Sequence, residues 1–260
     1  MSNSDVDKSK TIILSTEELS KSFEGLVALD KVSIEVPEKE ITLVMGPNGS
    51  GKTTLINVIT GFYNADGGKV IYEGKEITNK PPHEIYKLGI VRTFQIPQPL
   101  KKLTVLENLL IAGENEGEKI TRSLGKGWLK EESELVDKAF NILFFLGIGR
   151  LWDSEAYKLS GGQLKLLEIG RALMVDAKLI IMDEPIAGVA PSLAHTILKK
   201  LRELNNLGVT FLIVEHRLDI VLKYVDNIYV MANGKVIAKG KEEDILRDKR
   251  VVEVYLGASY

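Results

Sequence analysis

Hydrophobic residues along the chain gather in short continuous runs that end at glycine or at polar residues. Three of these runs, Ile41–Met45, Leu179–Met182 and Phe211–Val214, have the length and the uninterrupted apolar character of strands buried on both faces. Stretches rich in branched residues predict further strands at Thr11–Ser15, Val32–Val36 and Val70–Tyr72. An Asn233-Gly234 pair flanked by extended residues predicts a hairpin over Val230–Ala238.

Other segments carry the period of a helix. The patterns predict helices at Lys52–Thr60, Leu164–Met174 and Ser192–Leu204. Thr104 and Glu107 have the spacing of a capping box, so a helix is expected to start there. Within Glu132–Leu146, apolar residues recur on one helical face, at Leu135, Ala139, Leu143 and Leu146. The preceding stretch, Glu114–Trp128, is rich in glycine and charge and is interpreted as a loop or a lid-like insertion.

The order of these elements predicts the fold class. Strands alternate with helices in the first and last thirds of the chain, which favours an α/β fold with a mainly parallel sheet covered on both faces. The middle third is helical, and we interpret it as a helical subdomain inserted between two α/β halves. Ligands of such sheets bind at the carboxyl ends of the strands, where polar residues follow Met45, Met182 and Val214.

Composition narrows the classes of function. The chain has 260 residues, of which 44% are hydrophobic and 27% are charged, as in ordinary globular proteins. Its net charge of −2 provides no field that would hold a nucleic-acid backbone, so we expect no nucleic-acid partner. The absence of cysteine excludes disulfides, thiolate metal sites and thiol nucleophiles. No apolar stretch reaches the roughly 18 residues that span a bilayer, so any membrane role is expected to depend on a partner.

The segment after the first buried run matches the phosphate-loop pattern G-x-x-x-x-G-K-[ST]. Glycines let successive backbone N–H groups curl around a triphosphate, and the following helix end adds its dipole. Lys52 is predicted to reach the β- and γ-phosphates, and the Thr53 hydroxyl to bind Mg²⁺. The predicted ATP-binding residues of this loop are Gly46, Pro47, Asn48, Gly49, Ser50, Gly51, Lys52, Thr53 and Thr54.

A second buried run ends in two carboxylates, Asp183 and Glu184. Alone, such an ending is often just a solvated strand end. Beside a phosphate loop, Asp183 is placed to hold Mg²⁺ through water. Glu184 could then orient and deprotonate the water that attacks the γ-phosphate.

A third signal is the segment Leu-Ser-Gly-Gly-Gln at residues 159–163, which precedes the predicted helix Leu164–Met174. Ser160 can cap this helix, whose first N–H groups would then face outward as an anion site. Nothing in the same chain obviously fills that site. A second phosphate-binding element therefore suggests that two copies of the chain share one nucleotide.

Together, the phosphate loop, the Leu-Ser-Gly-Gly-Gln segment and the acid-ended strand resemble the ATP-binding-cassette (ABC) ATPases over nearly the whole chain. The resemblance implies one domain over residues 1–260. Its phosphate-loop α/β core, with an N-terminal antiparallel β-subdomain, would take about 1–95 and 165–260, and its helical subdomain about 96–164. The resemblance also implies ATP or ADP and Mg²⁺ as ligands. Two subunits would pack head to tail, so that ATP on one phosphate loop meets the other chain's Leu159, Ser160, Gly161, Gly162 and Gln163.

Three further positions are similar to functional residues of this family. Gln95 resembles the glutamine that senses Mg²⁺ and the γ-phosphate near the membrane partner. His216 resembles the switch histidine that contacts the γ-phosphate, and Phe23 the aromatic residue that stacks on adenine. Taken alone, these would be a solvated glutamine, a structural histidine and a core phenylalanine. The resemblance implies Lys52, Gln95, Glu184 and His216 as catalytic residues, and Thr53, Gln95 and Asp183 as Mg²⁺ ligands.

In finer detail, the chain resembles the ATP-binding subunits of branched-chain amino acid importers. The matching segments are Arg92–Gln95, Thr104–Asn108, Leu166–Leu173, Glu184–Pro191 and Val254–Gly257. This resemblance implies a homodimer, or a heterodimer with a related cassette subunit, bound to two transmembrane permease subunits at the cytoplasmic face of the cell membrane. An extracytoplasmic substrate-binding protein would act indirectly. One position departs from the pattern, because Ala190 stands where the wider family commonly has an aspartate that makes a polar contact across the dimer.

Three other classes of ATPase or kinase share some of these motifs. A soluble cassette ATPase without a transporter, such as one that serves iron–sulfur cluster assembly, would keep every ATP motif, although Ala190-Pro191 and the C-terminal match favour the importer. A chromosome-maintenance ATPase would need long heptad arms, which the sequence lacks. A phosphate-loop kinase would leave the Leu-Ser-Gly-Gly-Gln segment unexplained. The transported substrate stays open, with urea or amides as alternatives to amino acids, because the family's binding protein and membrane subunits choose it.

Overall fold

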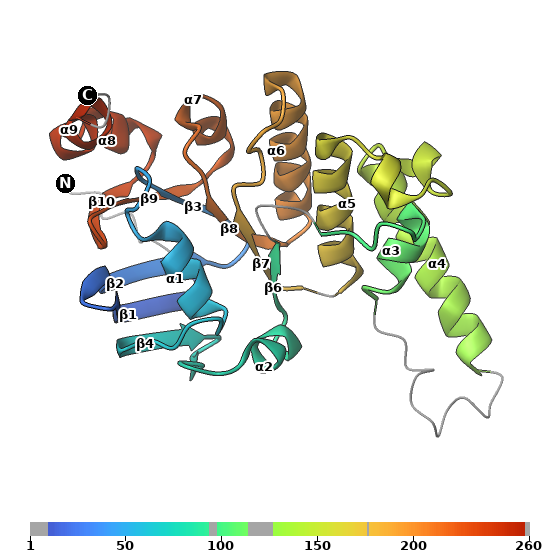
Figure 1. Cartoon of the computed structure of the whole chain (residues 1–260), viewed down its shortest axis with the longest axis horizontal. Coiled ribbons are helices and arrows are strands. Elements are labelled where there is room, and N and C mark those ends of the chain that lie inside the picture. The colour runs from blue at the N-terminus through green and yellow to red at the C-terminus, as the bar shows by residue number, and fades with distance from the viewer. Residues whose placement is uncertain (1–9, 94–97, 114–126, 176, 258–260) are drawn as a thin grey trace, which may run out of the picture.

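The computed structural model describes residues 10–93, 98–113, 127–175 and 177–257, which form two β-sheets and a group of helices (Figure 1). The smaller sheet is antiparallel, with strand order β2-β1-β4-β5. Its strands are β1 (Ile12–Phe23), β2 (Leu26–Pro37), β4 (Gly67–Tyr72) and β5 (Lys75–Glu76). The β-subdomain implied by the resemblance is thus present, although β1 and β2 run well beyond the predicted Thr11–Ser15 and Val32–Val36. Pairing between β1 and β2, rather than local composition, extends them through polar residues.

The larger sheet has six strands in the order β10-β9-β3-β8-β7-β6. The members are β3 (Ile41–Met45), β6 (Ile90–Thr93), β7 (Leu179–Asp183), β8 (Thr210–Val214), β9 (Asn227–Ala232) and β10 (Lys235–Gly240). Neighbouring strands are parallel except for β9 and β10. The predicted hairpin is confirmed there, since Asn233 and Gly234 both have the positive φ that its tight turn requires. The predicted mainly parallel sheet is therefore confirmed.

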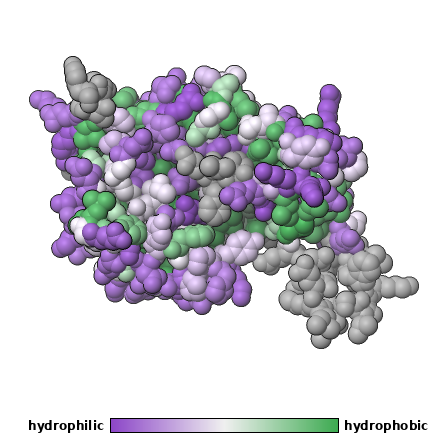
Figure 2. All heavy atoms as spheres, viewed as in Figure 1, coloured by the Kyte–Doolittle hydropathy of each residue, from purple (hydrophilic) through white to green (hydrophobic). Residues whose placement is uncertain are grey.

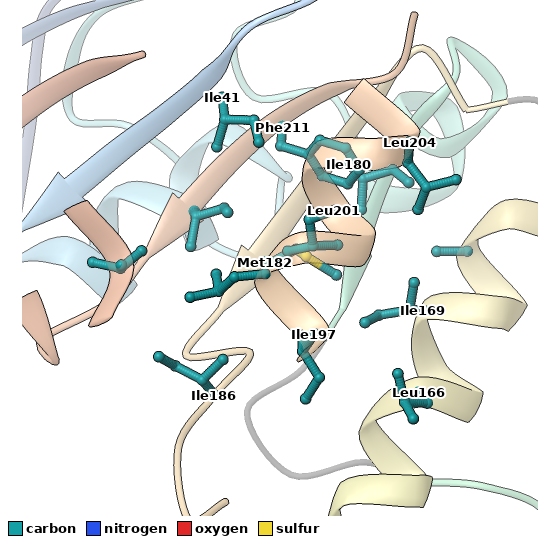
Figure 3. Packing of buried hydrophobic residues seen from close by; sticks show 14 of the residues in the cluster. Ile41, Leu166, Ile169, Ile180, Met182, Ile186, Ile197, Leu201, Leu204 and Phe211 are labelled. Carbon is teal, nitrogen blue, oxygen red and sulfur yellow. The ribbon is translucent and has the colours of Figure 1, made fainter. Parts of the chain in front are cut away.

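Both faces of the six-stranded sheet are covered, which explains why its strands read as continuous apolar runs. Ile180 and Met182 of β7 point into a core shared with the helices α5 (Gly161–Met174) and α6 (Pro191–Asn206), as Figure 3 shows. Leu179 and Ile181 belong to a second core, which the small sheet and the helix α1 (Lys52–Ile59) complete. This two-sided burial holds the carboxyl ends of β3, β7 and β8 in one row.

The predicted helices of the middle third gather at one end of the molecule, where α3 (Val105–Leu110) and α4 (Gly127–Phe145) pack against α5 (Figure 1). The capping box is confirmed: the Thr104 hydroxyl accepts the Glu107 N–H at 3.2 Å, and the Glu107 carboxylate accepts the Thr104 N–H at 2.7 Å. Of the stretch interpreted as a loop or lid, residues 114–126 lie outside the described part of the chain, and 127–128 begin α4. Figure 2 shows a largely hydrophilic face, with hydrophobic residues gathered over this helical end.

Several short elements carry too little periodicity to be predicted from the sequence. They are α2 (Pro82–Lys87), η2 (Gly149–Leu151), η3 (Ala156–Lys158), α7 (Leu218–Val221), η4 (Leu222–Tyr224), α8 (Glu242–Arg247) and α9 (Lys249–Gly257). The edge strand β6 was not predicted either, because its four residues include a polar Arg92 and Thr93. Within the described ranges, no helix has the length and apolar character needed to cross a membrane.

The core on the α5–α6 side of the sheet makes one stability prediction. Phe211 of β8 is fully buried in it, so Phe211→Ala should lower the free energy of unfolding by about 3–5 kcal/mol. Leu207→Ala is the matched control, since that side chain is 78% exposed and its loss should change stability by less than about 0.5 kcal/mol. Denaturant unfolding followed by circular dichroism measures both. A cost below about 1 kcal/mol for Phe211→Ala would contradict this description of the core.

Candidate functional site

The phosphate loop lies between the end of β3 and the start of α1, as its chemistry requires. Two of its glycines pass so close to neighbouring backbone that no side chain would fit. A Cβ on Gly46 would lie 2.2 Å from the Met231 carbonyl oxygen, and one on Gly51 would lie 2.4 Å from the Ala28 carbonyl oxygen. The loop is thus held between β2 and β9, and Gly51 also has a positive φ of 101°.

Lys52 folds back over this loop. Its ammonium group donates hydrogen bonds to the carbonyl oxygens of Gly46 at 2.8 Å and Pro47 at 2.9 Å, and lies 3.4 Å from the Ser50 hydroxyl. Burial lowers the pKa of the Lys52 amine, and the carboxylates of Glu184 and Asp183 act in the opposite direction. A buried cation is therefore held inside the loop, with two carboxylates nearby.

A cavity of about 490 Å³ opens beside the loop, within the size range of small-molecule sites. One wall is the loop itself, and the other comes from the β1–β2 hairpin, Glu184 and the turn between β9 and β10. The lining residues are Phe23, Leu26, Val27, Ala28, Asn48, Gly49, Gly51, Lys52, Thr53, Thr54, Glu184 and Asn233. A larger cavity of about 710 Å³ lies near Lys178, before the amino end of β7, and contains none of the predicted site residues.

Phe23 stands at the mouth of the smaller cavity, at the end of β1. The residue is 37% exposed, and its ring meets Tyr63 edge-on at a centroid distance of 5.2 Å, while the Lys21 ammonium lies 5.3 Å from the ring centre. The alternative of an ordinary core phenylalanine does not fit this exposure. An aromatic face at the rim of a phosphate-loop cavity is suited to stack on a nucleotide base.

This placement predicts that Phe23→Ala weakens ATP binding by about 5- to 150-fold, because base–aromatic stacking contributes about 1–3 kcal/mol. Phe23→Trp keeps an aromatic face and should bind ATP nearly as well as the unchanged chain. Displacement of a fluorescent nucleotide measures both affinities. Equal affinity for the Ala and Trp variants would argue against stacking.

Asp183 ends β7 and is buried, with an ion pair to Arg92 at 3.3 Å. Burial raises the pKa of the Asp183 carboxyl, and Arg92 counteracts this increase. Arg92 also donates to the Asn57 side chain on α1, and its guanidinium lies over the Phe62 ring at 5.3 Å. The sequence indicated Arg92 only as part of the matching segment Arg92–Gln95, whereas the structure shows that it joins β6, α1 and the acid-ended strand.

Glu184 adopts a left-handed conformation, with φ of 50°, which is uncommon for a residue with a side chain. Its N–H donates to the Val214 carbonyl at 2.9 Å, which fixes this turn against β8. Glu184 lines the cavity, and its Oε1 lies 3.4 Å from Nδ1 of His216. The structure thus brings Glu184, His216 and the phosphate loop together at one edge of the sheet. Backbone strain of this kind clusters at active sites.

The segment from Leu159 to Gln163 forms the start of α5. The Ser160 hydroxyl accepts the Gln163 N–H at 3.3 Å, and the Gln163 side chain accepts the Ser160 N–H at 2.8 Å. A Cβ on Gly162 would lie 2.0 Å from the Leu193 side chain, so this helix end packs closely on α6. None of these five residues lines the cavity beside the phosphate loop. Gln95 lies outside the described residues.

Two buried charged residues next to the site were also missed by sequence reasoning. Lys165 of α5 donates a hydrogen bond to the backbone carbonyl of Glu184 at 2.8 Å. The Glu215 carboxylate accepts the backbone N–H groups of Ile186 at 2.9 Å and His216 at 3.2 Å. Burial raises the pKa of Glu215, and these two hydrogen bonds act in the opposite direction. In the sequence, the signal for Glu215 was a charged residue directly after a buried strand. The signal for Lys165 was a charged residue inside an apolar helix.

Comparison with known proteins agrees with this geometry. A model of the ABC transporter family matches residues 29–187. A probable branched-chain amino acid transport ATP-binding protein, LivG, from Archaeoglobus fulgidus is 70% identical over 246 residues, which cover 95% of this chain and 96% of the relative. A protein of the same description from Methanocaldococcus jannaschii is 59% identical over 250 residues, covering 94% and 97%.

Solved structures show the same fold. The nucleotide-free crystal structure of an ATP-binding cassette from an ABC transporter aligns with a TM-score of 0.82 and 59% identity, covering 94% of this chain and 99% of that one. The ADP conformation of an ATP-binding cassette of an ABC transporter aligns with a TM-score of 0.83 and 56% identity, covering 95% and 99%. On the strength of the family match, these relatives and the geometry of the phosphate loop, the chain belongs to the ABC transporter family as an ATP-binding ATPase subunit.

Proposed function

We propose that this chain binds and hydrolyses ATP to drive an importer, with branched-chain amino acids as the transported substrates. The observation that carries the ATPase part is the cavity that joins a phosphate loop, an aromatic rim at Phe23 and the carboxylate of Glu184. The description of the relatives as branched-chain amino acid transport proteins supports the choice of substrate. We also propose that residues 1–260 form a single ABC ATPase domain, in which residues of about 96–164 make up the helical subdomain.

The chemistry follows from the placement of three side chains. Lys52, held inside the loop by the Gly46 and Pro47 carbonyls, turns toward the β- and γ-phosphates when a triphosphate enters. Glu184 orients a water molecule for in-line attack on the γ-phosphate and accepts its proton. His216, next to Glu184, stabilises the charge on the transferring phosphoryl group.

Magnesium fits the oxygen donors at this site. Asp183 supplies a buried carboxylate, and Thr53, which lines the cavity, carries a hydroxyl; both are hard oxygen ligands of the kind that Mg²⁺ prefers. Mg²⁺ is usually held by one or two such groups together with substrate phosphates, so this pair suits it. Gln95 is the third proposed ligand. When bound, the ion would neutralise charge on the β- and γ-phosphates.

A dimer completes the site. The amino end of α5, capped by Ser160, directs N–H groups outward and suits a γ-phosphate. Because this end does not line the chain's own cavity, we propose that it docks on the ATP of a second subunit, either an identical chain or a related cassette. Release of phosphate then removes the bound anion that joins the two subunits, and the dimer opens.

Two permease subunits, served from outside by a substrate-binding protein, would place this dimer at the cytoplasmic face of the membrane. A groove of about 250 Å³ between α2, β6, α3 and α5 is suited to receive a permease segment. It adjoins Thr93, close along the chain to Gln95, and exposes Tyr86 and Ile111 at its rim. Docking there would connect the permease to Arg92 and so to Asp183.

The test is a pull-down of tagged Glu184→Gln protein, with ATP, from detergent-solubilised membranes of its own source. Recovery of polytopic membrane subunits supports the transporter, and their identity directs a transport assay to branched-chain amino acids. Recovery of soluble assembly factors alone would overturn the transport proposal and favour a cassette ATPase without a transporter. The same pull-down without ATP is the control for binding that does not depend on dimer closure.

A further inference from the structure

The turn that carries Glu184 is bonded to helix α5 through a buried lysine. Lys165, in the first two turns of α5 and 7% exposed, donates to the Glu184 carbonyl at 2.8 Å. The same carbonyl accepts the N–H of Ala187 at 3.1 Å, so Lys165 binds the turn at the point where its backbone closes. Burial lowers the pKa of Lys165, and the carboxylates around it, with that of Glu168 first, oppose this effect.

Buried groups on the opposite side hold the same segment. Glu215 accepts the N–H groups of both Ile186 and His216, and Arg217 donates to the Val189 carbonyl at 3.1 Å. These contacts tie residues 186–189 to the loop that carries His216. On the other side of the turn, Lys165 connects the Glu184 carbonyl to α5, the helix that Ser160 caps.

We propose that Lys165 is a positioning residue that transmits the docking of the α5 amino end to the Glu184 turn of the same chain. This inference rests on the proposed dimer, in which α5 meets the ATP of the other subunit while Glu184 acts on the chain's own ATP. Because α5 is a single rigid helix, a displacement of its first turn moves the Lys165 ammonium and the carbonyl bound to it. The link provides communication between the two ATP sites without a polar side chain at Ala190.

Lys165→Met tests the role in turnover. Methionine keeps the length and the apolar stem of lysine but removes the charge and the donor. We expect kcat for ATP to fall by about 10-fold or more with KM within about twofold, as when a group acts after substrate binding. Lys165→Arg, which keeps a donor, should recover part of kcat.

Lys138→Met is the matched control. Lys138 donates to the Met174 carbonyl at 3.0 Å, a bond of the same kind at the other end of α5 and away from Glu184. The Lys138→Met substitution should therefore leave kcat for ATP unchanged. If Lys165→Met keeps its kcat, or if Lys138→Met lowers kcat equally, the proposal is overturned.

Hydrogen exchange separates transmission from simple stability. In Glu184→Gln protein, ATP should protect residues 160–165 and residues 184–190 from exchange. In Glu184→Gln/Lys165→Met protein, ATP should still protect 160–165 but no longer protect 184–190. Equal protection of 184–190 in both proteins would overturn the link. Failure of ATP to protect 160–165 in Glu184→Gln protein would instead overturn the proposed dimer, and this inference with it.

Discussion

Glu184→Gln is expected to bind ATP with the affinity of the unchanged chain and to lose nearly all turnover, about 10²- to 10⁴-fold, because it removes the carboxylate that we propose as the general base. Glutamine has almost the same shape, so the left-handed turn and the Val214 hydrogen bond should persist. Its amide can still contact Nδ1 of His216, now 3.4 Å from Glu184 Oε1, but it cannot take a proton from water. Steady-state phosphate release and a nucleotide-binding titration measure the two quantities separately.

The control for this prediction is Glu35→Gln, which removes a carboxylate paired with Lys239 on the surface. Exposed pairs of this kind contribute little, so its turnover should stay within about twofold of the unchanged chain. ATP should also shift Glu184→Gln protein to a dimer in size-exclusion chromatography, because the bound nucleotide is not consumed. Near-normal turnover of Glu184→Gln would remove Glu184 from the role of base.

Lys52→Met is expected to weaken ATP binding by about 10- to 150-fold, because a hydrogen bond to a charged group contributes about 1.5–3 kcal/mol. Methionine fills the space of the stem but leaves the Gly46 and Pro47 carbonyls without this donor. The two carboxylates near the loop would also lose the cation that partly neutralises them. Turnover at low ATP should therefore fall by at least the same factor. Calorimetric titration with ATP and with adenosine distinguishes a phosphate contact from a general loss of the site.

Two outcomes decide the role of Lys52. Adenosine should bind Lys52→Met protein as it binds the unchanged chain, since we propose that the base stacks on Phe23 and that Lys52 contacts only the phosphates. Lys178→Met, which removes an exposed lysine paired with Glu73, should alter neither affinity. If ATP affinity is preserved in Lys52→Met, the lysine serves only to brace the loop.

Local sequence patterns correctly predicted those elements that interactions between residues close together in the sequence determine. The hairpin turn at Asn233-Gly234 and the capping box at Thr104 depend on residues a few positions apart, and both were located from the sequence. The central strands of the large sheet were recognisable because burial on both faces requires continuous apolar runs. The family itself followed from the phosphate loop and the Leu-Ser-Gly-Gly-Gln segment, which have fixed spacing.

Predictions failed where pairing at long range decides the structure. Polar residues in the second half of β1 form a strand because β2 and β4 pair with them, not because of their own propensity. β6 is a strand because it pairs with β7, from which it is separated by the whole helical subdomain. A local pattern contains no information about such partners, so element boundaries were the least accurate part.

By itself, the sequence determined the family of this protein and predicted its chemistry: which residues would hold phosphate and which carboxylates would act on water. Only the tertiary structure decided how those residues are supported. It placed Phe23 at the rim of the cavity, Arg92 against Asp183, and Lys165 on the Glu184 carbonyl. In a sequence, a buried charge with a partner is indistinguishable from a solvated one. The difference arises when folding removes water from both groups and sets the distance between them.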